Sequence, residues 1–479
     1  MNQEETIRTN FIVCTQCLGR GKKSKGLSKN VRKNYQNALR QYEHSGRSGS
    51  EPILPKAHLH VCLSCNGSGI VECQDKPIAD VAKFPHVAII GAGIGGVALA
   101  IACLHRNVPF TLFERDENFE ARSQGYGLTL QQATKAVEGL GIRSLKDGVI
   151  STKHIVHKTD GEIIGSWGNR KWIAAEDDYS SKRTNVHIAR QSLRQALLEQ
   201  LGDDDKVSWG HQLLDLTESK EGISLEFNFE GQIKKTHADI VIGADGIRSI
   251  VRKKIIGDQY TPLRYLDCIV ILGICPLAAL DNIESPLLDS ATVFQTANGN
   301  ERIYVMPYDQ NTVMWQLSFP MAEQAAIALS LKGPNGLKAE AVKRTNWHSP
   351  IPQIIAATPE FKISGYPVYD RKILTEEDLK SLGNCTLIGD AAHPMSPFKG
   401  QGANQALLDA LSLANTIYKV CNQPNPWERA EIRETILKEY ERDMLLRSAV
   451  KVKDSAAAAQ FLHSNDVLRE SDAPRGSRS

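Results

Sequence analysis

Three glycines with G-x-G-x-x-G spacing are the first residues in this chain whose types and spacing suggest chemistry. Gly91 permits a tight turn, Gly93 lets the backbone approach a pyrophosphate, and Gly96 lets a following helix pack close to the preceding strand. Glu114 lies 18 residues after Gly96, where a carboxylate can accept hydrogen bonds from the ribose hydroxyls of an adenosine. The spacing therefore predicts a dinucleotide-binding turn.

The elements that must position these residues are also visible in the sequence. Residues 86–90 form a short apolar run typical of a buried strand, and residues 95–106 predict a helix whose N-terminus faces the phosphates. Residues 109–113 predict a second strand that ends at Glu114. Because these parts occur in the expected order, the pattern is more specific than the glycines alone.

Two copies of a C-x-x-C-x-G-x-G pattern lie near the N-terminus. Their cysteines are Cys14, Cys17, Cys62 and Cys65. Two thiolates on one knuckle supply half of a tetrahedral site, so the pair predicts one structural Zn²⁺. A disulfide or redox pair is the alternative, and Cys73, His58 and His60 lie nearby as further candidate ligands. The pattern resembles the cysteine-rich repeat of DnaJ-type chaperones, although 44 residues separate these two knuckles, far more than in that repeat.

The segment between the knuckles predicts a basic amphipathic helix. Its apolar residues recur at helical spacing, and Ser28 is placed to cap the first turn. Residues 20–47 contain nine lysines and arginines and one acid. This basic surface suggests a protein or anionic partner, although a solvated helix face is the simpler interpretation.

The whole chain has the composition of an ordinary globular protein. Its 479 residues are 41% hydrophobic and 23% charged, with a net charge of +2, and they predict two or three domains. This small net charge gives no global attraction to nucleic acid or acidic membranes. We expect no signal peptide and no membrane span, a cytoplasmic location, and a monomer or homodimer.

Two further motifs follow the glycine-rich turn. Residues 240–242 predict a strand that runs into Gly243-Ala-Asp245-Gly246, and Arg190 lies earlier at a strand-to-helix junction. Residues 385–417 predict a strand, Asp390, a loop rich in proline and glycine, and a long helix.

Residues 86–462 resemble the single-component FAD-dependent aromatic hydroxylases. The resemblance rests on three motifs in this order: GAGIGG with Glu114-Arg115, then GADGIRSIVR, then GDAAHPMSPFKGQGANQALLDA. That family includes para-hydroxybenzoate, salicylate and urate hydroxylases and the tetracycline-inactivating monooxygenases. The resemblance implies an α/β fold with a Rossmann-like FAD-binding domain, an interleaved β-sheet substrate domain and a long C-terminal helix. It implies domain boundaries at 1–80 for the zinc module, 84–257 and 376–426 for the FAD-binding domain, and 258–375 for the substrate domain. A C-terminal helix at 427–462 and a disordered tail at 463–479 complete the expected organisation.

The resemblance also implies which residues bind the cofactor. Glu114 would hold the adenosine ribose, Arg190 would reach the pyrophosphate or ribityl chain, and Asp390 would accept hydrogen bonds from ribityl hydroxyls. Residues 397–402 would pass the isoalloxazine, where the dipole of the helix starting near Gln401 would stabilise an anionic reduced flavin. The full expected set is Gly91, Gly93, Ile94, Gly96, Glu114, Arg115, Arg190, Asp245, Gly246, Asp390, Pro397, Gly400, Gly402 and Ala403.

The implied reaction is hydroxylation of an aromatic or heteroaromatic small molecule. NADPH or NADH would bind transiently and reduce FAD, and O2 would then react through a flavin C4a-hydroperoxide. The sequence fixes no catalytic side chain, and His393 is more simply a structural part of its loop. Candidate substrate contacts are Met306, Tyr308, Trp315, Gln316 and Phe319, although each is also compatible with ordinary sheet core.

Two other functions remain open at this point. One is a flavin-dependent reductase or dehydrogenase on the same scaffold, which would not incorporate oxygen. The other is a non-enzymatic flavin redox sensor whose zinc module recruits a partner.

Overall fold

The computed structural model describes residues 9–47, 52, 54–55, 58–121, 125–131, 133–168, 185–202, 206–380, 382–423 and 427–475. The chain divides into two compact units, Met1–Ile78 and Ala79–Ser479. Among the described helices, none combines the length and apolar character that crossing a bilayer requires.

The first unit contains two small antiparallel ribbons and one helix. Strand β1 (Asn10–Val13) pairs with β4 (Ile70–Cys73), and β2 (Lys22–Ser24) pairs with β3 (Leu59–Val61). Helix α1 (Lys29–His44) begins after Ser28, whose hydroxyl accepts a hydrogen bond of 3.4 Å from the backbone N–H of Val31. None of the residues of α1 is buried, so this unit has little apolar core besides the cysteines.

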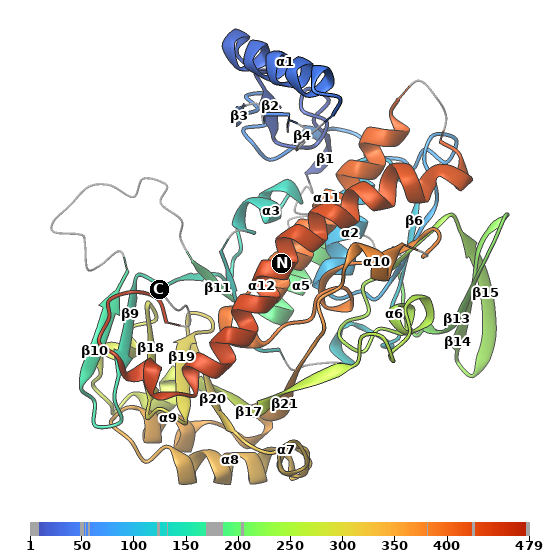
Figure 1. Ribbon diagram of the computed structural model, residues 1–479. Coiled ribbons are helices and arrows are strands. Elements are labelled where there is room, and N and C mark those ends of the chain that lie inside the picture. Colours follow the sequence, from blue (N-terminus) through green and yellow to red (C-terminus); the bar gives the residue numbers. More distant parts are fainter. Residues whose placement is uncertain are drawn as a thin grey trace. The chain divides into compact units, whose positions relative to one another are not determined.

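A parallel five-stranded sheet forms the centre of one half of the second unit. Its order is β12 (Val207–Ser208), β6 (Phe110–Phe113), β5 (Val87–Ile90), β16 (Ile240–Gly243) and β22 (Cys385–Leu387). Helices α2 (Ile94–Leu104), α5 (Arg190–Leu201) and α11 (Gly402–Cys421) pack together beside it (Figure 1). Both β5 and β16 are fully buried, as their continuous apolar runs predict for central parallel strands.

The other half of the second unit is built on a seven-stranded mixed sheet. Its order is β10 (Ile163–Trp167), β9 (Lys153–His157), β18 (Thr292–Ala297), β19 (Arg302–Pro307), β20 (Thr312–Pro320), β17 (Leu263–Pro276) and β21 (Ile363–Arg371). Helices α7 (Glu323–Ser330), α8 (Gly333–Arg344) and α9 (Ile351–Ala357) cover one face and enclose an apolar core with it (Figure 1). The expected limits of 258–375 miss β9 and β10, which join this sheet from an earlier part of the chain.

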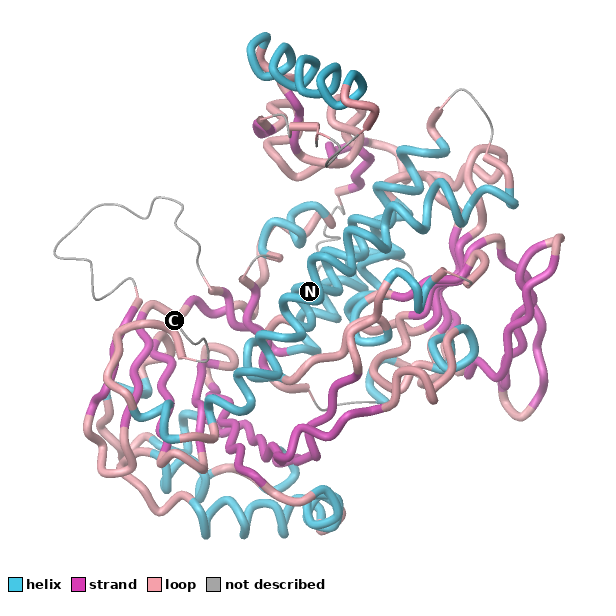
Figure 2. Tube along the Cα trace, viewed as in Figure 1, coloured by secondary structure: helices cyan, strands magenta, loops and turns pink. Residues whose placement is uncertain are grey.

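Smaller elements complete the second unit. A three-stranded sheet has the order β7 (Gly127–Leu130), β11 (Val186–Ala189) and β8 (Val149–Ile150), and a meander is formed by β13 (Gln212–Ser219), β14 (Gly222–Phe229) and β15 (Gln232–Ala238). The short helices α3 (Thr134–Gly139), α6 (Ile250–Ile255) and α10 (Glu376–Leu379) also belong to this unit. Figure 2 shows the strands of the meander as a separate hairpin layer at one edge of the unit.

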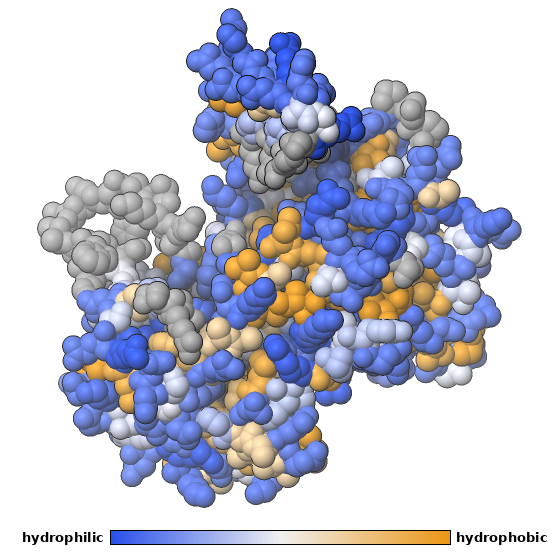
Figure 3. Space-filling model, in the orientation of Figure 1, coloured by the Kyte–Doolittle hydropathy of each residue, from blue (hydrophilic) through white to orange (hydrophobic). Residues whose placement is uncertain are grey.

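The expected long C-terminal helix is present, with a π-helical turn before it and exposed apolar side chains along it. Helix α12 (Lys438–Leu462) follows a π-helical turn at Arg433–Leu437 and contacts α11. Apolar side chains gather on the face along which α12 runs (Figure 3), where Leu446 and Val450 of this helix are 72% and 55% exposed.

The segment after α12 differs from the expected disordered tail. A 3₁₀ turn spans Asn465–Leu468, and the backbone N–H of Ser471 donates a hydrogen bond of 3.0 Å to the carbonyl oxygen of Ile164. The N–H of Ser166 donates one of 2.8 Å to Oδ1 of Asp472. The polar composition misled the prediction because these groups pair with strand β10 rather than with water. Residues 476–479 of the expected tail lie outside the described residues.

Candidate active site

The glycine-rich turn has the geometry that its spacing predicts. Gly91 has a φ of +108°, and a Cβ there would lie 2.6 Å from the carbonyl oxygen of Ala244. A Cβ on Gly96 would overlap the carbonyl oxygen of Gly91. At Gly93, Nη2 of Arg190, at 4.0 Å, is the only atom of the described residues within 4 Å of an added Cβ. The turn therefore leaves open space above Gly93 beside a guanidinium group, as a pyrophosphate requires.

The carboxylate of Glu114 is buried and supports this turn. Its Oε2 accepts a hydrogen bond of 2.8 Å from the N–H of Ala92, and its Oε1 accepts one of 3.1 Å from the N–H of Asp116. Each carboxylate oxygen has a second lone pair, so both can still accept a bond from a ribose hydroxyl. Arg115, by contrast, is exposed.

Sequence reasoning missed Arg194, which lies one helical turn after Arg190 in α5. Its Nε donates a hydrogen bond of 2.8 Å to the carbonyl oxygen of Ala92, and the guanidinium lies over the rings of Phe119 and Trp209. Spacing of four residues on one helix face is the signal that could have revealed it, because Arg190 and Arg194 must point the same way. Arg194 therefore fixes the turn that Arg190 faces.

Buried arginines join the second motif to the third. Nη1 of Arg252 donates hydrogen bonds of 2.9 and 2.8 Å to the carbonyl oxygens of Ala391 and Ala392. Burial lowers the pKa of Arg252 to about 10. Arg371 donates from Nε to the carbonyl oxygen of Ile247 at 2.9 Å. These bonds hold the loop after Asp390 against the loop after β16.

Asp245 and Gly246 in the second motif have mainly local contacts. Oδ2 of Asp245 accepts hydrogen bonds from the N–H groups of Ile250 and Val251, at 2.7 and 3.2 Å, at the start of α6. Burial raises the pKa of the Asp245 carboxyl. Gly246 has a φ of +81° and open space where a Cβ would be.

Asp390 reaches into a cavity at the start of α11. A Cβ added to Gly402 would lie 3.4 Å from its Oδ1, so the carboxylate borders the first turn of that helix. The surrounding protein raises the pKa of the Asp390 carboxyl, and the charges of His393 and Arg190 oppose this effect.

His393 belongs to a separate buried network. Its Nε2 lies 2.7 Å from Oδ2 of Asp409, which also accepts a hydrogen bond of 2.8 Å from the N–H of Gly389. Oδ1 of Asp409 accepts one of 2.9 Å from Nη2 of Arg447. His393 is not among the described residues that line the cavity, which agrees with a structural rather than a catalytic role.

The loop before α11 forms one wall of the cavity. Pro397–Lys399 make a 3₁₀ turn, Gly400 has a φ of +58°, and α11 then runs for 20 residues from Gly402. Asn404 was not predicted. Its side chain accepts hydrogen bonds from the N–H groups of Gln131 and Ala133 and donates to the carbonyl oxygens of Thr129 and Gly400. It therefore ties this loop to β7.

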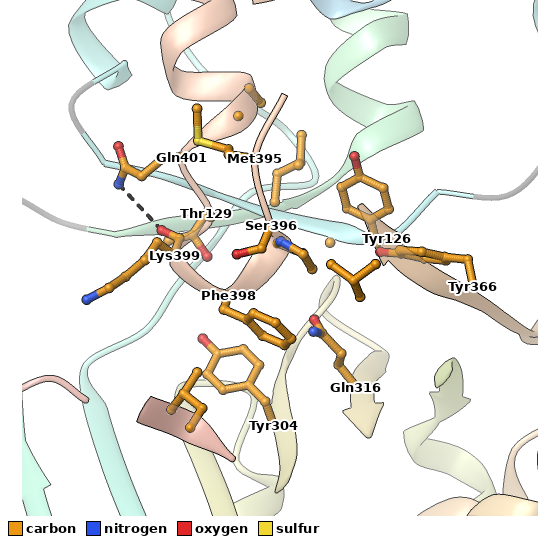
Figure 4. A pocket seen from close by; sticks show the side chains of 18 of the residues that line it. Tyr126, Thr129, Tyr304, Gln316, Tyr366, Met395, Ser396, Phe398, Lys399 and Gln401 are labelled. Carbon is orange, nitrogen blue, oxygen red and sulfur yellow. Dashed lines mark hydrogen bonds between the residues drawn. The ribbon is translucent and has the colours of Figure 1, made fainter. Parts of the chain in front are cut away.

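The cavity has a volume of about 970 Å³ and lies between this loop and the open face of the seven-stranded sheet. In Figure 4, Tyr304, Gln316 and Tyr366 reach in from strands of the sheet, Phe398 from the loop, and Tyr126 from the residue before β7. Ala403 and Pro397 are also part of the lining. The cavity thus adjoins the second and third motifs, GADGIRSIVR and GDAAHPMSPFKGQGANQALLDA, which are expected at the flavin.

Side chains point alternately to the two faces of the sheet, so the predicted substrate contacts divide between the cavity face and the opposite face. Met306 and Gln316 line the cavity. Trp315 and Phe319 are fully buried on the opposite face, within the core under α7–α9, so their prediction as lining residues is wrong. Successive residues of a strand point to opposite faces, and a single sequence does not say which face is open. The hydroxyl of Tyr308 donates a hydrogen bond of 2.9 Å to the carbonyl oxygen of Gly125, and Tyr308 is not part of the described lining.

A buried cation on the cavity face was not predicted. Arg302 in β19 is 5% exposed, its Nε donates a hydrogen bond of 2.7 Å to Oε1 of Gln295, and its guanidinium lies 4.9 Å from the ring centre of Tyr304. Burial lowers its pKa to about 10. No described carboxylate pairs with it. The described lining as a whole contains five lysines and arginines against two aspartates, so the cavity favours an anion.

A chain of hydrogen bonds follows one cavity wall. Nδ1 of His187 lies 3.0 Å from Oγ1 of Thr129, and its Nε2 lies 2.7 Å from Oγ of Ser151. Burial lowers the pKa of His187 to about 3, so the ring is neutral at physiological pH. The adjacent His154 is stacked on Trp167, with ring centres 5.2 Å apart.

The four N-terminal cysteines come together as the sequence predicts. Cys14 Sγ lies 3.9 Å from Cys62 Sγ, Cys17 Sγ lies 3.7 Å from Cys65 Sγ, and all four sulfur atoms are within 4.8 Å of one another. The N–H groups of Gly21 and Gly69 each donate to a sulfur at 3.3 Å. Among the described residues, His58, His60 and Cys73 are not in this cluster.

Fold and site together define a flavin-binding α/β protein of the monooxygenase class. The model of one family, the FAD binding domain, matches residues 85–447, and the chain belongs to that family. This result confirms the predicted α/β FAD-binding fold. The relatives reported next are named monooxygenases, so together with this match they support the expected FAD-dependent monooxygenase and not the reductase or sensor.

Curated relatives point to the same class. A protein named probable FAD-dependent monooxygenase from Arthroderma benhamiae is 25% identical over 79% of this chain and 92% of its own length. The 3-amino-4-hydroxybenzoate 2-monooxygenase of Streptomyces cremeus is 27% identical over 79% of this chain and 88% of its own. A crystal structure of Klebsiella pneumoniae HpxO with FAD and uric acid is 20% identical, covers 80% of this chain and 90% of its own, and has a TM-score of 0.65, which supports the fold.

Proposed function

We propose that this enzyme holds FAD from the glycine-rich turn to the loop before α11 and uses NADPH or NADH and O2 to hydroxylate an aromatic or heteroaromatic compound that carries an acidic group. The observation that carries the proposal is one cavity lined both by Asp390 and Gly402 and by the buried cation Arg302. A flavin beside Asp390 and Gly402 and an anionic ring beside Arg302 would share that space.

The residues present fit FAD. The open space above Gly93 beside Arg190 suits the pyrophosphate, and the spare lone pairs of Glu114 suit the ribose. Asp390 is placed to accept hydrogen bonds from ribityl hydroxyls, and the N-terminus of the 20-residue α11 favours negative charge at the adjoining ring edge. When bound, FAD supplies the redox chemistry that activates O2.

The protein's own groups would orient the substrate and keep water away. Nη1 and Nη2 of Arg302 are the donors left for a carboxylate or phenolate, because Nε is already bonded to Gln295. The pKa of Tyr304 is raised to about 12 by burial, so this phenol stays protonated and can donate a hydrogen bond. Met306, Met314 and Phe398 supply apolar contacts for a ring.

Heat release of the flavin tests the identity of the cofactor. Flavin released by heat from the purified protein is expected to be FAD, and recovery of FMN alone would contradict the role of Glu114.

Labelled oxygen tests the reaction directly. Oxidation of NADPH and NADH is then measured with aromatic acids and with their amides. We expect an acid to stimulate oxidation and to gain one atom from ¹⁸O2. NAD(P)H oxidation without oxygen incorporation into any acid of the panel would overturn the proposal.

We also assign one structural Zn²⁺ to Cys14, Cys17, Cys62 and Cys65. A tetrahedral site with Zn–S bonds of about 2.3 Å has sulfur atoms about 3.8 Å apart. The distances of 3.9 and 3.7 Å support this assignment. Four thiolates leave no open position, so the ion would stabilise the module and take no part in catalysis.

A further inference from the structure

The segment that follows α12 lies beyond the family match, which ends at residue 447, and it covers an open sheet edge. Strand β10 is the first strand of the seven-stranded sheet, and among the described strands it pairs only with β9. On its other side the N–H of Ser471 bonds to the carbonyl oxygen of Ile164, and Oδ1 of Asp472 accepts a bond from the N–H of Ser166. Nη2 of Arg475 donates a further bond of 3.0 Å to the carbonyl oxygen of Ile164.

Gly165 makes this close approach possible. A Cβ at this position would overlap the carbonyl oxygen of Ser471 and would lie 3.2 Å from Nη2 of Arg475. Gly165 does not have a positive φ, so its own backbone conformation would accept alanine. Glycine is therefore required at residue 165 for the close approach of the docked segment, and the strand's own backbone does not require it.

The end of this segment is part of the cavity wall. Pro474 and Arg475 both line the cavity, on the side that also contains Trp167 and His154. Arg475 is half-buried, and burial lowers its pKa, while the charge of Asp472 opposes that effect. The cation therefore reaches the cavity from a terminal segment that lies outside the family domain.

We propose that residues 469–475 form a strap that closes the substrate cavity of this chain, and that Arg475 contributes to recognition of an acidic group on the substrate. The identity of the cavity as a substrate site rests on the proposed function. A substrate that carries an anionic substituent would pair with Arg475, and the strap would also restrict entry of water. Specificity then depends on a terminal segment as well as on the family domain.

Hydrogen–deuterium exchange of the FAD-loaded full chain tests the docking of the strap. Asp472→Ala removes the acceptor of the Ser166 N–H, and Gly165→Ala places a methyl group against Ser471. Both are expected to speed exchange in peptides that span β10 by tenfold or more, because edge-strand amides without a partner exchange readily. Asp472→Asn keeps an acceptor oxygen and should remain protected. Unchanged exchange in both disruptive variants would overturn the strap.

Binding of a matched pair of probes tests the role of Arg475. Benzoate and benzamide are titrated into the holoprotein, with the flavin absorbance spectrum as the readout. Arg475→Gln is expected to weaken benzoate binding about tenfold, the lower end of the loss of a charged hydrogen bond, and to leave benzamide binding unchanged. Arg442→Ala on α12 is the control, because this side chain lies outside the strap, is 67% exposed and pairs with Glu376. Failure of wild type to prefer benzoate, or equal losses for both probes, would overturn this role.

The two proposals can fail separately. Exchange at β10 requires no turnover, so a docked strap in a protein that incorporates no oxygen would contradict the proposed function alone. Hydroxylation with a freely exchanging β10 edge would contradict the strap alone.

Discussion

Nε of Arg302 donates a 2.7 Å hydrogen bond to Oε1 of Gln295 on the neighbouring strand β18, at the cavity face of the sheet. This bond orients a buried guanidinium that has no carboxylate partner among the described residues. A buried charge without a partner is costly, and the proposed function assigns an acidic group of the substrate to it.

Replacement of Arg302 by methionine should therefore selectively weaken the binding of acidic substrates. The loss of a charged hydrogen bond costs roughly 1.5–3 kcal/mol, which raises Kd or KM for an aromatic acid by about 10- to 100-fold. Arg302→Lys keeps the charge but not the bidentate geometry, so its loss should be intermediate. Titration of benzoate and benzamide into the holoprotein measures both effects. Arg442→Met is the control, because this side chain on α12 is 67% exposed, and an equal loss there would refute selective recognition.

Asp390→Ala should weaken FAD binding. The substitution removes an acceptor for ribityl hydroxyls beside the first turn of α11, at a cost of roughly 1.5–3 kcal/mol. Asp390→Asn keeps one acceptor oxygen at the same place, so it should retain most of the affinity. Titration of apoprotein with FAD, followed by flavin fluorescence, gives the dissociation constants. If the alanine variant binds FAD as wild type does, Asp390 is not part of the cofactor site.

Buried neutral histidines predict that stability falls as the pH is lowered. The pKa of His187 is lowered from an ordinary value near 6.5 to about 3, with burial as the main cause and the charge of His154 as a smaller one. Between these values the unfolded chain binds a proton that the folded chain excludes. The free energy of unfolding therefore falls by up to about 1.4 kcal/mol per pH unit for this group below pH 6.5.

His187→Gln should flatten that dependence. Thermal unfolding of the wild type and the variant is compared from pH 7.5 to pH 4.5, with the exposed His44→Gln as control. His154, His157 and His463 also have pKa values lowered to about 4, so part of the dependence should remain in the variant. Parallel Tm curves for wild type and His187→Gln would contradict the prediction.

Local patterns predicted the parts of this molecule that depend on neighbours in the sequence. The turn at Gly91, the cap at Ser28 and the cysteine knuckles each follow from a few adjacent residues, and the structure agrees with them. The sequence did not predict Arg302 and Arg475 as cavity residues, because each acquires its role from segments distant in sequence. Trp315 and Gln316 are adjacent yet face opposite sides of β20, a distinction that only the packing of α7–α9 determines.

The last prediction concerns the cysteine module. Deletion of residues 1–78, at the boundary between the two units, should remove one zinc ion per chain and leave FAD bound. The module has few apolar residues in its core besides Cys14, Cys17, Cys62 and Cys65, so metal binding must supply much of its folding free energy. The glycine-rich turn and both later motifs lie in the second unit, which contains its own buried sheets. Elemental analysis and the flavin spectrum of the truncated chain provide independent measurements. In the full chain, Cys62→Ser should lose the zinc while Cys73→Ser, outside the cluster, should keep it. Zinc retained after the deletion, or FAD lost with it, would show that the two sites are not independent.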